Sequence, residues 1–93
     1  MEHVFIQRTG DKAEILMLYN EFKLISKLDL VHSYNSNVRI GIVGSHAQGQ
    51  RLVALHNAFK FVFGYSPISI EENIIISLTG KIQLNEDNWI YEN

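Results

Sequence analysis

The stretch Val38 to Gln48, VRIGIVGSHAQ, decides how this chain is interpreted, because it resembles a strand that runs into a helix. Val38 to Val43 is almost continuously apolar, which is typical of a strand covered on both faces of a sheet. Gly44 ends that run, and Ser45 to Gln48 has the Ser-x-x-Gln spacing of a helix-capping box. The sequence therefore predicts a strand over 38–43 and a helix that begins at residue 46.

The segment after His46 carries apolar residues at the three- and four-residue spacing of one helix face. These residues are Leu52, Leu55, Phe59, Val62 and Phe63. Gly64 follows, and glycine is common just past the last turn of a helix. A helix over 46–63 is predicted, and together with the preceding strand and turn it is the clearest unit of the chain.

A similar unit precedes it. His3 to Arg8 contains three strand-forming residues in a row and is predicted to be a short strand that ends at Thr9-Gly10. Asp11 and Glu14 then have the spacing of a capping box, with Asp11 as the predicted N-cap residue. A second apolar stripe follows, formed by Ile15, Leu18, Tyr19, Phe22 and Ile25. The stripe predicts a helix over 12–27.

Two segments allow more than one interpretation. Residues 28–37 alternate in a way that suits a strand, and Asn35-Ser36-Asn37 suits a turn. Residues 66–69 and 70–79 suit a short strand followed by a helix capped at Ser69 and ended by Gly80. Alternatively, residues 73–78 and 81–84 form a hairpin across Thr79-Gly80, which the three consecutive isoleucines favour. We prefer the helix over 70–79 because its capping pattern is complete.

The preferred order of elements is β-α-β-α-β-α, which predicts an α/β fold with a small parallel sheet and helices packed on it. The alternative is an α+β ferredoxin-like fold, β-α-β-β-α-β, with an extra C-terminal strand. Either plan makes residues 1–93 a single domain. The polar tail, residues 85–93, is expected to pack on the domain or on a second subunit.

Composition excludes several classes of function. The net charge of the 93 residues is −2, so no basic stripe for nucleic acid is expected. The chain contains no cysteine, which rules out disulfides, thiolate nucleophiles and cysteine-ligated zinc. It has no apolar run of about 20 residues, the length that spans a membrane. Its opening residues lack the pattern of a signal peptide. We therefore expect a cytoplasmic protein without a nucleic-acid or membrane partner.

Residues 38–78 are similar to the C-terminal half of small STAS-like domains, where a strand, a helix, a short strand and an acid-rich helix start follow one another. Ser69 to Glu72 resembles that acid-rich start. The resemblance implies a non-enzymatic module that regulates or binds a partner. Some such domains are phosphorylated at a strand–helix junction beside an aspartate. Ser45 occupies a comparable junction here, although Gly44 stands before it.

The turn before the second predicted helix is the candidate ligand site. A helix N-terminus presents unpaired N–H groups and a positive dipole end, which suit an anion such as phosphate. His46 and Arg51 offer further charge-assisted donors. The candidate residues are Gly44, Ser45, His46, Gln48 and Arg51. In the alternative interpretation, Ser45 and Gln48 only cap the helix. A dinucleotide fingerprint is incomplete, because His46 stands where the pyrophosphate would approach closely.

No catalytic, cofactor or metal site is predicted. Ser45 and His46 are adjacent, so their side chains diverge and do not form a nucleophile–base pair. The four histidines lack the spacing of zinc ligands. Only a meeting of His32 with His46 at one edge of the sheet would bring two of them together.

The last candidate is an apolar surface. The helix over 46–63 is apolar on more than one side, because Phe59 and Phe63 share a face that Phe61 does not. Either the tail or a second subunit is expected to cover Phe61. The predicted interface residues are Phe61, Tyr65, Trp89 and Tyr91. The predicted function is therefore binding to another protein or to a second copy as a homodimer, with small-anion binding as the alternative.

Overall fold

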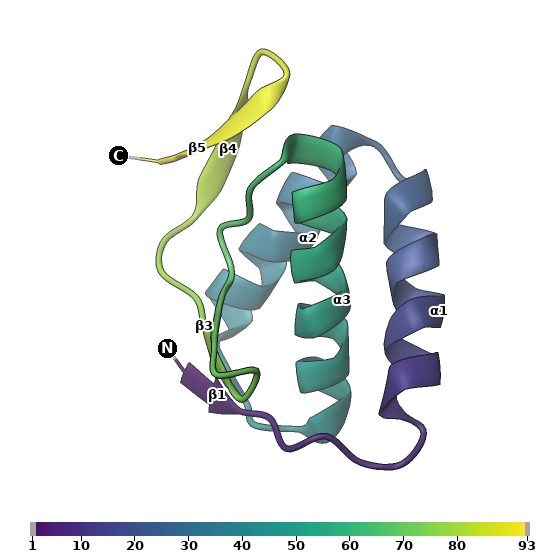
Figure 1. Cartoon of the computed structure of the whole chain (residues 1–93). Coiled ribbons are helices and arrows are strands. Elements are labelled where there is room, and N and C mark those ends of the chain that lie inside the picture. The colour runs from purple at the N-terminus through teal and green to yellow at the C-terminus, as the bar shows by residue number, and fades with distance from the viewer. Residues whose placement is uncertain (1, 93) are drawn as a thin grey trace.

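The computed structural model describes residues 2–92 and contains both helices and strands, as predicted (Figure 1). The elements are β1 (Glu2–Val4), α1 (Asp11–Leu24), α2 (Lys27–Ile40), α3 (His46–Phe63), β2 (Ser69–Glu71), β3 (Ile75–Ser77), β4 (Ile82–Asn85) and β5 (Asn88–Tyr91). Their order is β-α-α-α-β-β-β-β, which neither predicted order matches. The strands of residues 2–92 pair only in antiparallel fashion, so the predicted parallel sheet is wrong.

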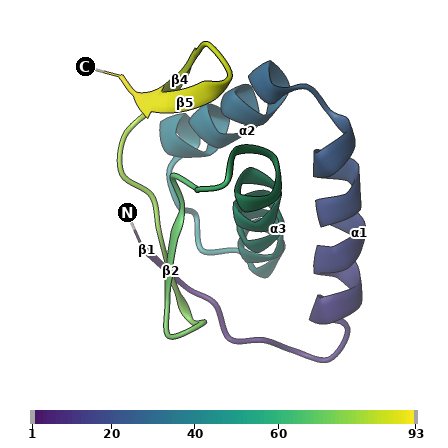
Figure 2. The same cartoon turned by 45° about the horizontal axis from the view of Figure 1, so that its top comes forward.

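Helix α3 forms the centre of the molecule, with α1, α2 and the strands arranged around it (Figure 2). Most of one side of α3 is buried, and Leu52, Ala54, Ala58 and Phe59 are fully buried. The predicted bounds, 46–63, are confirmed. Gly64 ends the helix at a φ of 88°, a left-handed conformation that glycine adopts without steric cost.

Residues 27–40 form helix α2, so the strand predicted over 38–43 is wrong, as is the possible strand over 28–37. The Ser26 hydroxyl accepts a hydrogen bond from the Asp29 N–H (3.1 Å), which caps the helix. Leu30 and Tyr34, four residues apart, face the core. Gly41 ends the helix, and Ile40 at its last position is 63% exposed. The apolar run over 38–43 therefore contains the last residues of a helix and the start of the following turn, and it does not form a buried strand.

Helix α1 begins one residue earlier than predicted and ends at Leu24. The predicted cap is wrong, because Gly10 is the N-cap residue and Asp11 is already helical. The Asp11 carboxylate accepts a hydrogen bond from the Arg8 N–H instead (2.6 Å). The strand predicted over 3–8 is confirmed only in its first part, as β1 ends at Val4.

Strands β1, β3 and β2 form a three-stranded antiparallel sheet with β3 in the middle. Ile76, at the centre of β3, is fully buried. The helix predicted over 70–79 is wrong, because Glu72 and Asn73 form a tight turn between β2 and β3, both with positive φ. The β-branched isoleucines therefore decide the structure here, not the capping pattern.

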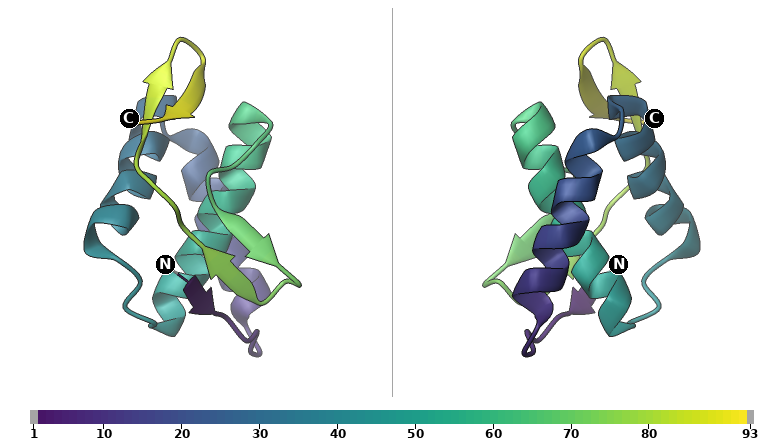
Figure 3. Two further views of the ribbon diagram at one scale, coloured as in Figure 1. Left: turned by 90° about the vertical axis from the view of Figure 1, so that its left-hand side faces the viewer. Right: turned by 90° about the vertical axis from the view of Figure 1, so that its right-hand side faces the viewer.

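Strands β4 and β5 form a separate hairpin that packs on α2 at one end of the molecule (Figure 3). The hairpin predicted across Thr79-Gly80 is wrong, because those residues connect the two sheets. The Asn35 side chain takes the place of a neighbouring strand. It donates to the Ile82 carbonyl (2.7 Å) and accepts from the Ile82 N–H (2.8 Å). Asn35, predicted to lie in a turn, is therefore a helical residue. Its side chain supplies hydrogen-bond partners for the backbone of Ile82 at the edge of β4.

Trp89 holds the C-terminal hairpin against the core of its own chain. Its ring stacks on Tyr65 at a centroid distance of 4.5 Å and meets Phe59 edge-on. The Trp89 indole N–H donates to the Tyr65 carbonyl (3.2 Å), and the Tyr65 hydroxyl donates to the Trp89 carbonyl. Of the two partners expected for the tail, the structure shows the domain itself.

None of the helices within residues 2–92 combines the length and the apolar character that a membrane crossing requires. The cytoplasmic location stays a prediction.

Candidate functional site

The structure disperses the candidate residues of the turn before α3. The Ser45 hydroxyl accepts from the Gln48 N–H (3.1 Å) and caps α3. The Gln48 carboxamide folds back over the turn, where it accepts from the Val43 N–H (3.0 Å) and donates to the Gly41 carbonyl (2.9 Å). Gly44 lies in this turn with a φ of 81°. Ser45 and Gln48 thus serve the structure of the turn, as in the alternative interpretation.

His46 points away from the turn toward α1. Its Nε2 atom lies 2.8 and 2.9 Å from the two carboxylate oxygens of Asp11, and its ring stacks on Phe5 at 4.7 Å. Asp11 is only 2% exposed. His46 and His32, which only a shared sheet edge would have brought together, lie apart, because His32 is on α2 beside a different groove.

The Asp11 carboxylate is surrounded by donors. Besides His46 and the Arg8 N–H, the Gln50 carboxamide donates to it (2.8 Å). Burial raises the pKa of Asp11, but the hydrogen bonds from Arg8, His46 and Gln50 outweigh it and leave the pKa lowered. This cluster joins the start of α1 to the start of α3. Sequence reasoning missed it because Asp11 and His46 are 35 residues apart.

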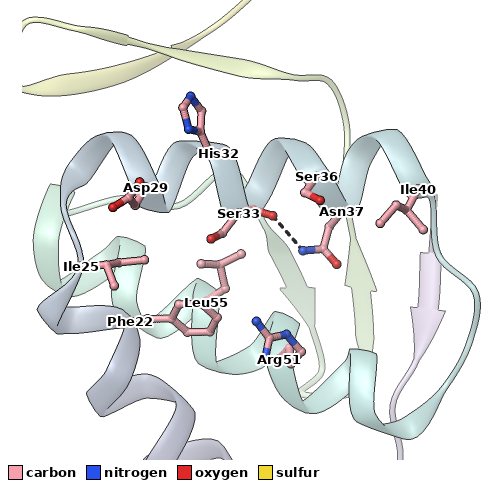
Figure 4. A pocket seen from close by; sticks show the side chains of 10 residues that line it. All are labelled: Phe22, Ile25, Asp29, His32, Ser33, Ser36, Asn37, Ile40, Arg51 and Leu55. Atoms are coloured by element: carbon pink, nitrogen blue, oxygen red, sulfur yellow. Dashed lines mark hydrogen bonds between the residues drawn. The ribbon is translucent and has the colours of Figure 1, made fainter.

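Arg51, the last of the candidate residues, lines a groove between α2 and the start of α3 (Figure 4). Its guanidinium lies over the Phe22 ring, 5.4 Å from the ring centroid. Among residues 2–92, no carboxylate lies within ion-pair distance of it. Arg51 and His46 therefore lie on different sides of α3. The five candidate residues do not surround a single ligand position.

The groove beside Arg51 has a volume of about 670 Å³. Its walls combine hydroxyl, amide and apolar groups. They come from Phe22, Ile25, Asp29, His32, Ser33, Ser36, Asn37, Ile40 and Leu55. The Asn37 amide donates to the Ser33 main-chain carbonyl (2.9 Å), a bond that involves the hydroxyl of neither Ser33 nor Ser36. Asp29 and Arg51 stand apart along the groove (Figure 4).

A second groove, of about 900 Å³, runs between α1 and α3. Its apolar lining comes from Ile15, Leu16, Tyr19, Val53 and Phe61, and its polar lining from Gln7, Lys12, Asn57 and Lys60. Phe61 is 66% exposed and meets Tyr19 edge-on at 6.3 Å. The C-terminal hairpin packs on α2, so it does not cover Phe61.

The other predicted interface residues lie elsewhere. Trp89 is 4% exposed and belongs to the core, so it is not available as a surface contact. Tyr65 and Tyr91 remain partly exposed, but both lie beside Trp89 and not beside the groove that contains Phe61. The predicted interface residues therefore do not form one surface.

His56, on α3, is a half-buried polar residue. Within residues 2–92, its Nδ1 atom is buried without a hydrogen-bond partner. Burial lowers the pKa of His56, which keeps the ring neutral at physiological pH. In the same residues, no three histidine or acidic side chains gather closely enough to hold a metal ion.

Comparison of the chain with protein-family models, curated proteins and solved structures gives no match. The resemblance to STAS-like domains stays a prediction.

Proposed function

We propose that this protein is a non-enzymatic binding module, and that the groove between α1 and α3 holds an acidic, amphipathic segment of a partner protein. The observation that carries the proposal is the position of Phe61, an aromatic residue that is 66% exposed in an apolar groove. Exposed aromatic groups in such grooves are typical anchors of protein interfaces.

The shape and lining of the groove suit a helical segment. Two antiparallel or crossed helices leave a furrow between them, and a third amphipathic helix places its apolar face in such a furrow. The apolar side chains of α1 and α3 supply the floor, with Tyr19 and Phe61 as the largest of them. A partner side chain that covers Phe61 removes apolar surface from water, at about 25 cal/mol per Å².

The charges around the groove select the partner. Lys12 and Lys60 line it, and the Lys23 ammonium lies 4.7 Å from the Tyr19 ring centroid and 5.1 Å from that of Phe61. Lys12, Tyr19 and Lys23 share one face of α1, while Glu14 and Glu21 fall on roughly the opposite face. Helix α3 has no acidic residue. An acidic partner is therefore complementary to this groove.

The same charges argue against a second copy as the occupant. A twofold dimer places the same patch of both subunits face to face. Lys12, Lys23 and Lys60 of one subunit would then oppose the same lysines of the other. For this reason we favour a different protein over the homodimer that the sequence suggested.

Two contacts support binding without catalysis. The Asp11 carboxylate already accepts hydrogen bonds from Arg8, His46 and Gln50. The Ser45 hydroxyl caps α3. The histidine–carboxylate pair is thus engaged in joining two helices, and the neighbouring hydroxyl does not face it as a nucleophile would.

The test uses two synthetic peptides of the same amphipathic helical pattern, one with glutamates and one with lysines on its polar face. Fluorescence anisotropy is measured with the intact protein at low and high salt. We expect the acidic peptide to bind, more weakly at high salt because the lysines are exposed. Phe61→Ser should weaken binding about tenfold or more. Reversal of charge in Lys12→Glu/Lys60→Glu should abolish the preference for the acidic peptide.

The matched control is Val43→Ser, because Val43 is 67% exposed but does not line the groove. It should leave binding unchanged. Equal affinity for both peptides, or equal loss with Val43→Ser and Phe61→Ser, contradicts the proposal. Light scattering decides the second-copy alternative. If the protein is a dimer and Phe61→Ser dissociates it, the occupant of the groove is a second copy of the chain and not an acidic partner.

A further inference from the structure

We infer that the groove between α2 and α3 is a second, separate binding site, which takes a small carboxylate with an apolar body and holds the carboxylate on Arg51. The groove shares no lining residue with the one that contains Phe61. The inference therefore goes beyond the proposed function and does not depend on it.

Arg51 has the features of an unoccupied anion receptor. Its guanidinium lies over the Phe22 ring, 5.4 Å from the ring centroid, and Arg51 lines the groove (Figure 4). No carboxylate of residues 2–92 pairs with it. A planar guanidinium binds a carboxylate through two parallel hydrogen bonds, which gives both affinity and orientation.

Polar groups on α2 face Arg51 across the groove. Ser33 and Asn37 point from α2 toward the side of the groove where Arg51 lies, and Ser36 also lines the groove (Figure 4). The hydroxyls of Ser33 and Ser36 are able to donate to a carboxylate oxygen. Because these groups come from α2 and Arg51 comes from α3, the site exists only when the two helices pack together.

Apolar groups provide the rest of the site. Ile40 is 63% exposed and Ile25 is 36% exposed, and both border the groove. An apolar ligand body placed against them covers surface that the protein's own side chains leave open. The volume of about 670 Å³ lies within the range of small-molecule sites, about 300–1,000 Å³.

The charge of the groove favours a monoanion over a phosphate. Arg51 is the single lysine or arginine of its lining, and Asp29 lines the same groove. A phosphate dianion would bring two negative charges to one arginine in a groove that also contains Asp29, whereas the arginine matches the single charge of a carboxylate. Of the residues predicted to hold phosphate, Gly44, Ser45, His46 and Gln48 do not line this groove.

The experiment titrates the whole protein with 3-phenylpropionate and follows backbone amide and Arg51 Nε–H signals by NMR. Neutral 3-phenylpropionamide and phenyl phosphate serve as comparison probes. We expect 3-phenylpropionate to shift the signals of Ser33, Ser36, Asn37 and Arg51, and the amide to bind about tenfold more weakly or worse. Arg51→Gln and Arg51→Lys should both weaken binding, the second because lysine lacks the planar pair of donors.

Arg39→Gln is the matched control, since Arg39 is exposed on α2 but does not line this groove. It should leave the affinity unchanged. Three results overturn the inference. The first is no shift of these signals at about 10 mM probe, a concentration that detects even weak ligands. The others are equal binding of the acid and the amide, or an equal loss of affinity in Arg39→Gln and Arg51→Gln. Tighter binding of phenyl phosphate would overturn the choice of a carboxylate.

Discussion

The Nε2 atom of His46 lies 2.8 Å from Oδ1 of Asp11, and this contact ties the first turn of α3 to the first turn of α1. The Phe5 ring stacks on His46, so the segment between β1 and α1 meets the same point. The Asp11 carboxylate accepts hydrogen bonds from the surrounding donors, and Asp11 is too deeply buried for water to replace a lost one readily. Loss of any of these donors would leave a buried charge poorly compensated, which is costly.

The first prediction concerns acid stability. The folded-state pKa of Asp11 lies below its ordinary value of 3.8 because the hydrogen bonds to the carboxylate outweigh the effect of burial. The stability that Asp11 contributes is therefore fully present above about pH 4 to 5 and is lost as the pH falls through the folded-state pKa. Asp11→Asn should lower the Tm at pH 7 and flatten the fall of Tm below about pH 5.

Circular dichroism follows thermal unfolding at a series of pH values from about 3 to 8, a range that spans the acid transition. Glu21→Gln, on the exposed side of α1, is the control for loss of one negative charge. A Tm profile of Asp11→Asn that runs parallel to that of the unmodified protein would contradict the prediction.

Gly49 provides the second prediction. A Cβ atom at this position would lie 2.3 Å from Cδ1 of Phe5 and 2.8 Å from Nε2 of His3, so β1 lies directly on the start of α3. Alanine normally stabilises a helix by about 1 kcal/mol relative to glycine. Here Gly49→Ala should instead lower the free energy of unfolding by about 1–3 kcal/mol, the usual cost of overpacking.

Urea denaturation measures the change at Gly49. Phe5→Ala in the same chain creates room for the new methyl group. The loss in the double variant should therefore be smaller than the sum of the two single losses. Additive losses, or a gain in stability from Gly49→Ala alone, would show that β1 does not lie on Gly49.

The third prediction tests the link between α2 and the C-terminal hairpin. Asn35→Ala removes both hydrogen bonds to Ile82, whose backbone is then left without partners at the edge of β4. We expect a loss of about 1–3 kcal/mol in the free energy of unfolding. Hydrogen exchange of the Ile82 amide should become faster. Asn20→Ala, at an exposed position of α1, should change neither quantity.

The fourth prediction distinguishes the observed helix α2 from a buried strand over 38–43. Ile40 is 63% exposed at the end of α2, whereas Ile76 is fully buried in β3. Ile76→Ala should cost about 2–5 kcal/mol in the free energy of unfolding. Ile40→Ala should change it by less than about 0.5 kcal/mol. Chemical denaturation measures both changes. Equal losses of unfolding free energy in the two variants would support a buried strand over 38–43 instead of the helix.

Local chemistry was enough to predict α1 and α3. The Ser45 cap, the apolar stripe that follows it and Gly64 are all signals between near neighbours, and they place α3 at its observed bounds. Helix α2 carried a comparable signal that the interpretation did not use. Ser26 and Asp29 have the spacing of a cap, and Leu30 and Tyr34 share a helix face.

The sequence by itself determined the mixed composition of the fold, helices α1 and α3, and the caps of the turn before α3, because each depends on residues within a few positions of one another. Only the tertiary structure decided whether the β-branched runs at 38–43 and 74–77 became a helix end or a strand, because such runs suit either state until a packing partner selects one. The same holds for the sites. Asp11 meets His46, and Arg51 meets the wall of α2, through contacts between helices that no short stretch of sequence contains.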